Sequence, residues 1–244
     1  SGKEHEQLAD LIRRTARRGG SVLIPAFAVD RTEVVLQTLT GFLRDGRIPE
    51  LPVYVNSPMA LAALSVYRDP RYAAELRPDL DVASFVDLPR LHEVRTTEES
   101  IALNRPRMPS IIISSSGMAS GGRVLHHLEH MLPDSRNAVV LAGYQAAGTR
   151  GRALLDGATH LKMHGRQVGV RAEILSDEEF SVHADASELL DWLAALTPAP
   201  RTVFTVHGTP ESAGRLAAAA TTRLGLHARA AELGETVDVT GGPS

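Results

Sequence analysis

The chain has 244 residues, of which 43% are hydrophobic and 23% are charged, and its formal net charge is -3 at pH 7. This hydrophobic content is typical of a folded globular protein and excludes disordered and collagen-like classes, while so small a net charge neither indicates nor excludes nucleic acid as a partner. Because cysteine is absent, disulfides and thiolate metal sites are excluded, and any metal must be held by imidazole and carboxylate groups.

The first segment is expected to form a helix, a strand and a second helix. Apolar residues at helical spacing predict a helix that ends at Gly19, and residues 21–27 form a short apolar run typical of a buried strand. Asp30 and Glu33 have the spacing of a capping box, so we expect them to begin a helix whose apolar residues lie within 34–42.

The same pattern repeats once and then becomes less regular. A strand is predicted at 52–55, followed by a helix with Ser57 as its N-cap and a proline in its first turn. Residues 69–109 are rich in turn formers, and within them we expect only a short strand at 82–86 and a helix near 98–103.

Strands and helices alternate clearly again in the second half of the chain. Expected strands are residues 111–113, 138–142, 168–174 and 202–206, and expected helices are residues 122–132, 186–196 and 211–224. Such alternation implies a mostly parallel sheet with helices on both faces, so the predicted fold class is α/β.

No part of the sequence is expected to associate with a membrane. No apolar run approaches the roughly 20 residues that span a bilayer, and residues 1–18 are polar and charged, unlike a signal peptide. We therefore expect a cytoplasmic protein.

Small polar residues follow several of the expected strands. In parallel sheets, ligands bind beyond the carboxyl ends of the strands, where loops and helix N-termini converge, and the backbone N–H groups there favour a phosphate. Any one such loop is equally well explained by turn chemistry alone. The residues predicted to contact a phosphorylated substrate are Arg31, Asn56, Ser57, Ser115, Ser116 and Gly117.

A nucleotide-binding motif is not expected. Residues 117–122 have the spacing of a P-loop, but Arg123 and Val124 stand where lysine followed by serine or threonine is required. No G-x-G-x-x-G motif follows an expected strand, so dinucleotide binding is not expected either.

Two of the ten histidines lie in loops at the ends of expected elements. His183 precedes a helix and His207 follows a strand, and catalytic groups are common in loops held by such supports. Asp185 and Glu211 could orient the two imidazoles as carboxylate partners. Taken alone, either histidine is more often structural than catalytic.

Other histidines carry weaker signals. His126, His127 and His130 lie on one expected helix, but the glutamate is out of place for an H-E-x-x-H zinc motif, so we interpret them as a partly exposed polar face. Surface positions are expected for His5, His92, His160 and His227.

In sequence order, these segments resemble the metallo-β-lactamase/β-CASP family of RNA nucleases. Matching stretches are residues 20–33, 56–60, 115–132, 142–154, 180–193 and 206–216. Residues 142–152 are the most specific of them and resemble bacterial and archaeal-type members. The resemblance implies a β-CASP domain at residues 1–180, followed at 181–244 by the C-terminal part of a metallo-β-lactamase αββα domain.

The resemblance also implies roles for the two loop histidines. His207 matches the motif C histidine, which is implied to ligate one of two zinc ions, and His183 matches the motif B histidine, which is implied to assist the leaving oxygen. Histidine at motif C resembles the RNA-directed branch of the family. The chain departs from the family pattern at Val182, where alanine is usual, and at Thr209 to Glu211, where a glutamate directly after Gly208 is usual.

The family's H-x-H-x-D-H metal motif has no counterpart in the sequence. A two-metal mechanism needs those ligands, so we expect this chain to be inactive alone and to be part of an intact zinc-dependent enzyme that cleaves single-stranded RNA. An alternative is a non-catalytic RNA-binding clamp or partner subunit. A third is an unrelated α/β protein that binds phosphate or a nucleotide. Assembly into a homo-oligomer stays open.

Overall fold

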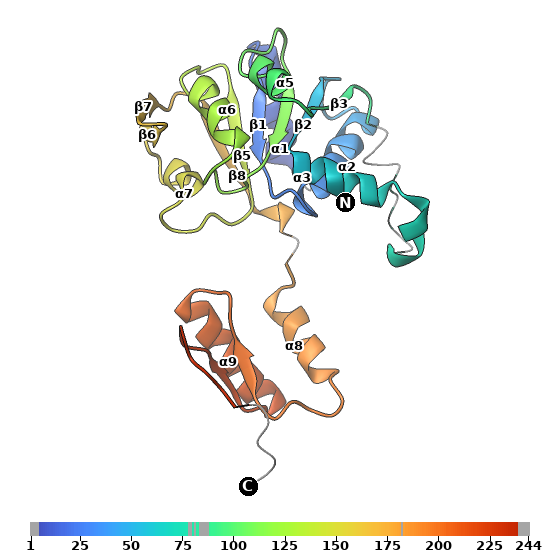
Figure 1. The fold of residues 1–244 in the computed structure, drawn as a ribbon, viewed down its shortest axis with the longest axis vertical. Helices are drawn as coiled ribbons and strands as arrows, with labels where there is room; N and C mark the ends of the chain where they lie inside the picture. The colour runs from blue at the N-terminus through green and yellow to red at the C-terminus, as the bar shows by residue number, and fades with distance from the viewer. Residues whose placement is uncertain (1–4, 78–79, 81, 83–87, 182, 239–244) are drawn as a thin grey trace. The chain divides into compact units, whose positions relative to one another are not determined.

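Figure 1 shows the fold as a computed structural model. The structure describes residues 5–77, 80, 82, 88–181 and 183–238. The chain divides into two compact units, Ser1–Val182 and His183–Ser244.

A six-stranded parallel sheet lies at the centre of the first unit. Its strand order is β3-β2-β4-β1-β5-β8, and all five pairings are parallel. The strands are β1 (Val22–Pro25), β2 (Val53–Asn56), β3 (Leu91–Glu93), β4 (Ile111–Ser114), β5 (Ala138–Ala142) and β8 (Glu173–Asp177). Strands β1, β4 and β5 are buried along their whole length, because both faces of the sheet are covered.

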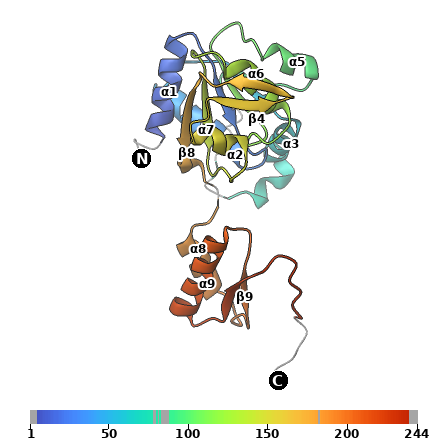
Figure 2. The same ribbon diagram turned by 90° about the vertical axis from the view of Figure 1, so that its left-hand side faces the viewer.

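Helices cover the two faces of this sheet (Figure 2). The helical elements of the first unit are α1 (Glu6–Arg17), α2 (Arg31–Arg44), α3 (Pro58–Tyr67), η1 (Pro70–Glu75), α5 (Thr97–Ala102), α6 (Arg123–Met131), α7 (Arg150–Leu155) and η2 (Glu178–Phe180). Alternate residues of β1 enter different cores. Val22 and Ile24 pack with α1, α2 and α3, whereas Leu23 packs with α6 and α7.

An antiparallel hairpin of β6 (His160–Met163) and β7 (Arg166–Gly169) completes the first unit. Leu161 and Met163 of β6 are buried in the same core as α6. The hairpin is therefore anchored to the body of the unit by its inward-facing side chains.

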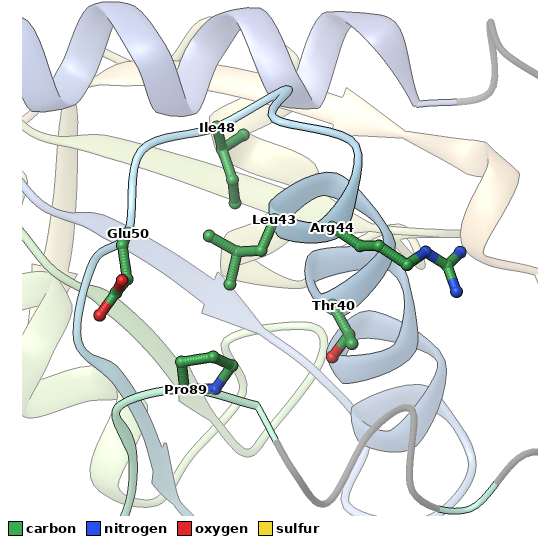
Figure 3. A pocket seen from close by; sticks show the side chains of 6 residues that line it. All are labelled: Thr40, Leu43, Arg44, Ile48, Glu50 and Pro89. Atoms are coloured by element: carbon green, nitrogen blue, oxygen red, sulfur yellow. The ribbon is translucent and has the colours of Figure 1, made fainter.

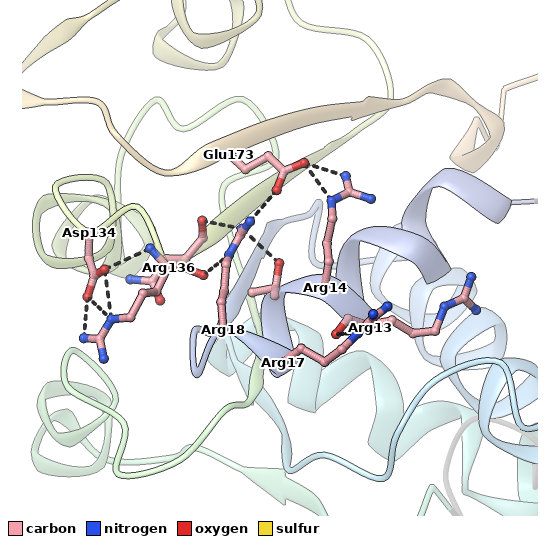
Figure 4. Close-up of polar contacts among 9 residues, drawn as sticks. Arg13, Arg14, Arg17, Arg18, Asp134, Arg136 and Glu173 are labelled. Atoms are coloured by element: carbon pink, nitrogen blue, oxygen red, sulfur yellow. Dashed lines mark hydrogen bonds and ion pairs between the residues drawn. The ribbon is translucent and has the colours of Figure 1, made fainter.

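Arginines of α1 attach this helix to the sheet (Figure 4). Arg14 Nε lies 2.9 Å from Glu173 Oε1, and Arg18 Nη1 lies 2.8 Å from Glu173 Oε2. Arg18 also donates to the backbone carbonyls of Arg136 and Asn137, which precede β5. These bonds join α1 to the amino-terminal ends of β5 and β8.

The second unit is smaller. It contains α8 (Ala186–Ala194), β9 (Val203–Thr205), α9 (Pro210–Leu224) and β10 (Ala228–Ala230), with β9 and β10 paired in parallel. Leu190 and Leu193 of α8 pack with Ala220 of α9.

The predicted α/β class is confirmed, and so are the Ser57 cap and the proline in the first turn of α3. The prediction of one strand at 168–174 was wrong, because this segment contains the end of β7 and the start of β8. The strand predicted at 82–86 falls almost entirely outside the described residues. No helix in the described ranges is both long and apolar enough to cross a lipid bilayer.

Candidate functional site

The carboxyl ends of four neighbouring strands bring the loops of interest to one edge of the sheet. Strands β2, β4, β1 and β5 are adjacent in that order, and Ser114 at the end of β4 is in register with Asn56 and Pro25. The loops that follow these strands therefore start side by side. Their sequences include the residues predicted to contact phosphate.

Asn56 is the centre of a buried network behind this edge. Its side chain is 0% exposed, and its Nδ2 lies 2.8 Å from Ser100 Oγ and 2.6 Å from His127 Nε2. Arg123 Nη1 donates to Asn56 Oδ1 at 2.8 Å. Asn56 thus holds the start of α6 against the end of β2.

His127 is neutral in this network. Burial lowers the pKa of its imidazole to about 4. Its Nε2 accepts from Asn56, so its proton is on Nδ1, which donates to Asn104 Oδ1 at 2.8 Å. The prediction of a partly exposed position was wrong for His127, because its ring is fully buried and hydrogen-bonded on both sides.

The segment Ser115 to Gly117, which we name the serine loop, lies next to Ser57. Ser57 Oγ accepts from Ala60 N at 3.2 Å, and Ser115 Oγ donates to Ser57 Oγ at 2.9 Å. Ser57 is buried, whereas Ser115 and Ser116 are partly exposed. Both serines are thus partly accessible, although Ser115 Oγ is bonded to Ser57 and Ser116 Oγ accepts from Ser120 N at 3.2 Å.

Gly117 has a steric reason to be glycine. A Cβ at this position would lie 3.0 Å from the Phe27 ring, closer than side-chain carbons normally approach. The side chain of Gln145 also holds Gly117 in place. Its Nε2 donates to the carbonyls of Gly117 at 3.2 Å and Gly143 at 3.1 Å. The serine loop is thus in contact with residues that follow β1 and β5.

Arg31 is 3% exposed and donates through Nη1 to the carbonyl of Ala142 at the end of β5. Burial lowers the pKa of its guanidinium from the ordinary value. The side chains of Arg31, Asn56 and Ser57 are therefore turned away from solvent, and Gly117 is buried as well.

Helix α2 begins after Asp30 as the spacing of Asp30 and Glu33 predicted, but the hydrogen bonds of a capping box are not formed. The N-cap residue Asp30 makes no capping hydrogen bond and has a φ of 63°. Glu33 is 5% exposed, and neither of its carboxyl oxygens has a hydrogen-bond partner of normal geometry among the described residues. Burial raises its pKa to about 7, opposed by backbone N–H groups at the start of α2 and assisted by the nearby charge of Asp30.

His183 and His207 are both exposed residues of the second unit. His183 stands two positions before Asp185, the N-cap of α8. His207 has a φ of 63° in the loop between β9 and α9. Both histidines therefore occupy the loops that the sequence predicted.

The proposed carboxylate partners of these histidines have other bonds here. Asp185 Oδ1 accepts from Glu188 N at 2.9 Å in a capping box. Glu211 pairs with Arg215 one turn further along α9. No hydrogen bond joins either carboxylate to an imidazole within the described part of the chain.

His5 contradicts the expectation of a surface position. Its Nδ1 lies 2.8 Å from Asp177 Oδ2, and its ring stacks on Phe180 at 4.2 Å between centroids. The other histidines expected at the surface are exposed, namely His92, His160 and His227.

Two groups among the described residues could hold a metal ion. One contains His5, Asp177 and Glu179, and the other contains His126, Glu129 and His164. Neither group is evident from the sequence, because each joins residues that are distant in the chain.

The pocket in Figure 3 lies at the opposite edge of the sheet. It is lined by Thr40, Leu43, Arg44, Ile48, Glu50 and Pro89. Glu50 and Pro89 precede β2 and β3, so the pocket faces the amino ends of these strands. It is separate from the serine loop.

Two known protein families match this chain, one in each of two consecutive segments. The Beta-Casp domain family matches residues 32–154, and the Zn-dependent metallo-hydrolase RNA specificity domain family matches residues 167–231. Ribonuclease TTHA0252 of Thermus thermophilus is 38% identical over 211 residues, which cover 84% of this chain and 47% of that protein.

Two archaeal relatives are similar at a comparable level. The transcription termination factor FttA of Pyrococcus abyssi is 33% identical, over 92% of this chain and 36% of its own length. The RNase J-like protein of Methanocaldococcus jannaschii is 32% identical, over 83% of this chain and 46% of its own length. The chain thus spans less than half the length of each of these relatives.

Proposed function

Because the chain belongs to the β-CASP family, we propose that it is part of a zinc-dependent ribonuclease that hydrolyses phosphodiester bonds in single-stranded RNA. In this proposal, residues 1–180 are the β-CASP domain and residues 181–244 are the return segment of a metallo-β-lactamase domain. The name of the second matching family and that of the Thermus thermophilus relative support it. The activity is assigned to an intact parent protein, of which this chain supplies part.

The observation that carries the proposal is the convergence of strand-end loops around the serine loop. Ser115 and Ser116 offer hydroxyl groups to an RNA phosphate. The carbonyl of Ser115 accepts from Val124 N in the first turn of α6, and the N-terminus of a helix favours an anion. Arg31, Asn56, Ser57 and Gly117 act as supports that hold these groups in place. This division of roles follows from which side chains are exposed.

Aromatic rings flank the proposed phosphate contacts. Phe27 is 43% exposed beside Gly117, and Tyr144 is 64% exposed directly after Gly143. Exposed aromatic faces stack on the bases of single strands irrespective of sequence. Phosphate contacts and stacking surfaces at one edge suit a single strand, whose bases are accessible.

His207 fits the role of one zinc ligand, because it is an exposed imidazole in a loop and imidazole is a preferred zinc donor. The chemistry that zinc supplies when bound is polarisation of the phosphodiester and activation of water. His183 is assigned to the leaving oxygen, to which a protonated imidazole can donate. Asp185 and Glu211 are proposed to orient the two imidazoles in the intact parent.

A second candidate function is a non-catalytic RNA-binding clamp or partner subunit. Neither of the two metal-capable groups in the described residues contains His183 or His207. A parent protein without further zinc ligands would therefore bind RNA without cleaving it.

The test uses the intact parent protein. We expect His207→Ala to lower both the zinc content and the cleavage of end-labelled single-stranded RNA, and His183→Ala to lower cleavage while zinc is retained. His227→Ala is the matched control, because His227 is another exposed histidine of the second unit. Equal zinc in His207→Ala and the wild type would contradict the ligand assignment, and RNA binding without cleavage by the wild type would support the clamp.

A further inference from the structure

Helix α6 and the β6–β7 hairpin bring three metal-binding side chains together. His126 and Glu129 are three residues apart on α6 and share one face of the helix. His164 stands in the turn between β6 and β7. One ligand atom from each of the three residues lies within 4.8 Å of the other two.

The contacts of these three side chains leave ligand atoms available for a metal ion. Glu129 Oε2 lies 3.0 Å from His164 Nδ1, and the His126 and His164 rings stack at 4.5 Å between centroids. The ring of His126 makes no hydrogen bond to any other described residue. His130 is not part of the group, and its Nδ1 bonds to the backbone carbonyl of His126 at 2.8 Å.

The hairpin turn fixes the position of His164. His164 and Gly165 have φ values of 46° and 77°, so both central residues of the two-residue turn are left-handed, as a type I′ turn requires. The flanking pair Met163 and Arg166 is in register, and Met163 is fully buried. The imidazole is thus presented to α6 by an anchored element rather than by a long loop.

We propose that His126, Glu129 and His164 form a zinc-binding site. Two imidazoles and one carboxylate are a donor set that zinc uses in sites with three protein ligands. Ligand atoms around tetrahedral zinc are roughly 3.3 Å apart for bonds of about 2.0 Å, so zinc binding draws the three ligand atoms closer and turns the stacked His126 and His164 rings until a nitrogen of each faces the ion. His126 and His164 are exposed, which leaves a fourth position for water.

The surrounding charges favour zinc over magnesium or calcium. Those ions prefer several oxygen ligands, and the group has only one carboxylate. Arg166 and His130 also face Glu129, so the local field is not strongly negative. Affinity must therefore come from imidazole coordination, which suits zinc. The site shares no residue with the proposed ribonuclease roles and does not depend on them.

The test is calorimetric titration of the metal-free chain with zinc chloride. We expect one zinc ion to bind at this site and the affinity to fall at least about tenfold in His164→Asn, since loss of an outer partner alone costs about 10–100-fold. Asparagine tolerates the left-handed turn, so this variant removes the ligand and keeps the hairpin. Glu129→Gln should weaken binding in the same way.

Two controls distinguish this site from other histidines. His130→Gln alters the same helix outside the group, and His207→Ala removes the histidine of the proposed ribonuclease site, so both should bind zinc at this site as the wild type does. Zinc should also raise the melting temperature of the wild type but not of His164→Asn, because it links α6 to the hairpin. Equal zinc affinity in His164→Asn and the wild type, or loss of binding in His207→Ala alone, would overturn the proposal.

Discussion

At the scale of single residues, Glu33 places a carboxyl group in the interior of the first unit. Its pKa is raised to about 7 from an ordinary value of 4.5. A group whose pKa rises on folding stabilises the fold while it is protonated. That contribution is complete below pH 4.5 and is lost as the pH rises through about 7.

We therefore expect Glu33→Gln to be more stable than the wild type at pH 8, by up to about 3 kcal/mol, and to lack the decline in stability between pH 4.5 and about 7. The measurement is urea unfolding at several pH values. Glu98→Gln is the control, because Glu98 is an exposed first-turn glutamate of α5. Parallel pH profiles for Glu33→Gln and the wild type would show that Glu33 is not the cause.

Gly117 allows a test of the serine loop. In Gly117→Ala the added methyl group would press on the Phe27 ring, displacing the loop and costing about 1–3 kcal/mol. We expect weaker RNA binding in a fluorescence anisotropy titration. Gly121→Ala should bind as the wild type does, since a Cβ there meets no atom within 4 Å. Equal RNA affinity in the two variants would remove the serine loop from the binding surface.

The position of a single side chain could be predicted from the sequence only where its contacts are with residues close to it in the chain. Ser57 could be predicted as an N-cap, because the hydrogen bond that it accepts comes from Ala60 N, only three residues along the chain. Glu33 has equally good local spacing, but packing of α2 against the sheet takes its side chain inward. The burial of His127 depends on Asn56, which is 71 residues away in the chain.

At the scale of elements, ion pairs add to the apolar packing that holds α1 against the sheet. The pKa of the Glu173 carboxyl is held below its ordinary value, first by hydrogen bonding to Arg14 and opposed by partial burial, with Arg18 assisting. A carboxyl with a lowered pKa contributes stability above pH 4.5 and loses it as the pH falls.

Arg14→Gln should thus destabilise the chain at pH 7 by about 1 kcal/mol or less, because the pair is partly exposed. The difference should shrink at pH 3 or in 1 M salt, as measured by urea unfolding. Arg17→Gln is the matched control from the same last turn of α1, since Arg17 does not bond to Glu173 in Figure 4. An effect of equal size in both variants would argue against the ionic attachment.

The prediction of element boundaries was wrong where a turn has an unusual sequence. The segment expected as one strand contains the end of a hairpin and the start of β8. The turn at His164 and Gly165 lacks the common Asn-Gly signal, although histidine tolerates the left-handed conformation that the turn requires. Strand β3 has only three residues, too few for a periodic pattern.

At the scale of the whole molecule, alternation of strands and helices predicted a parallel sheet but not its order. Strand β4 lies between β1 and β2, although it follows both in sequence. Such an order depends on contacts between distant segments, for which a single sequence contains no direct signal. Parallel pairing was nevertheless sufficient to predict that the strand-end loops would share one edge, since all carboxyl ends of a parallel sheet point the same way.

The bracing of the serine loop by Phe27, Ser57 and Gln145 has a thermodynamic consequence. A segment that is already ordered loses little conformational entropy when it meets a ligand, so in the proposed complex with RNA most of the ordering occurs in the RNA strand. RNA strands that are already stiffened by stacking of their own bases should therefore bind with a smaller entropic penalty than fully flexible strands.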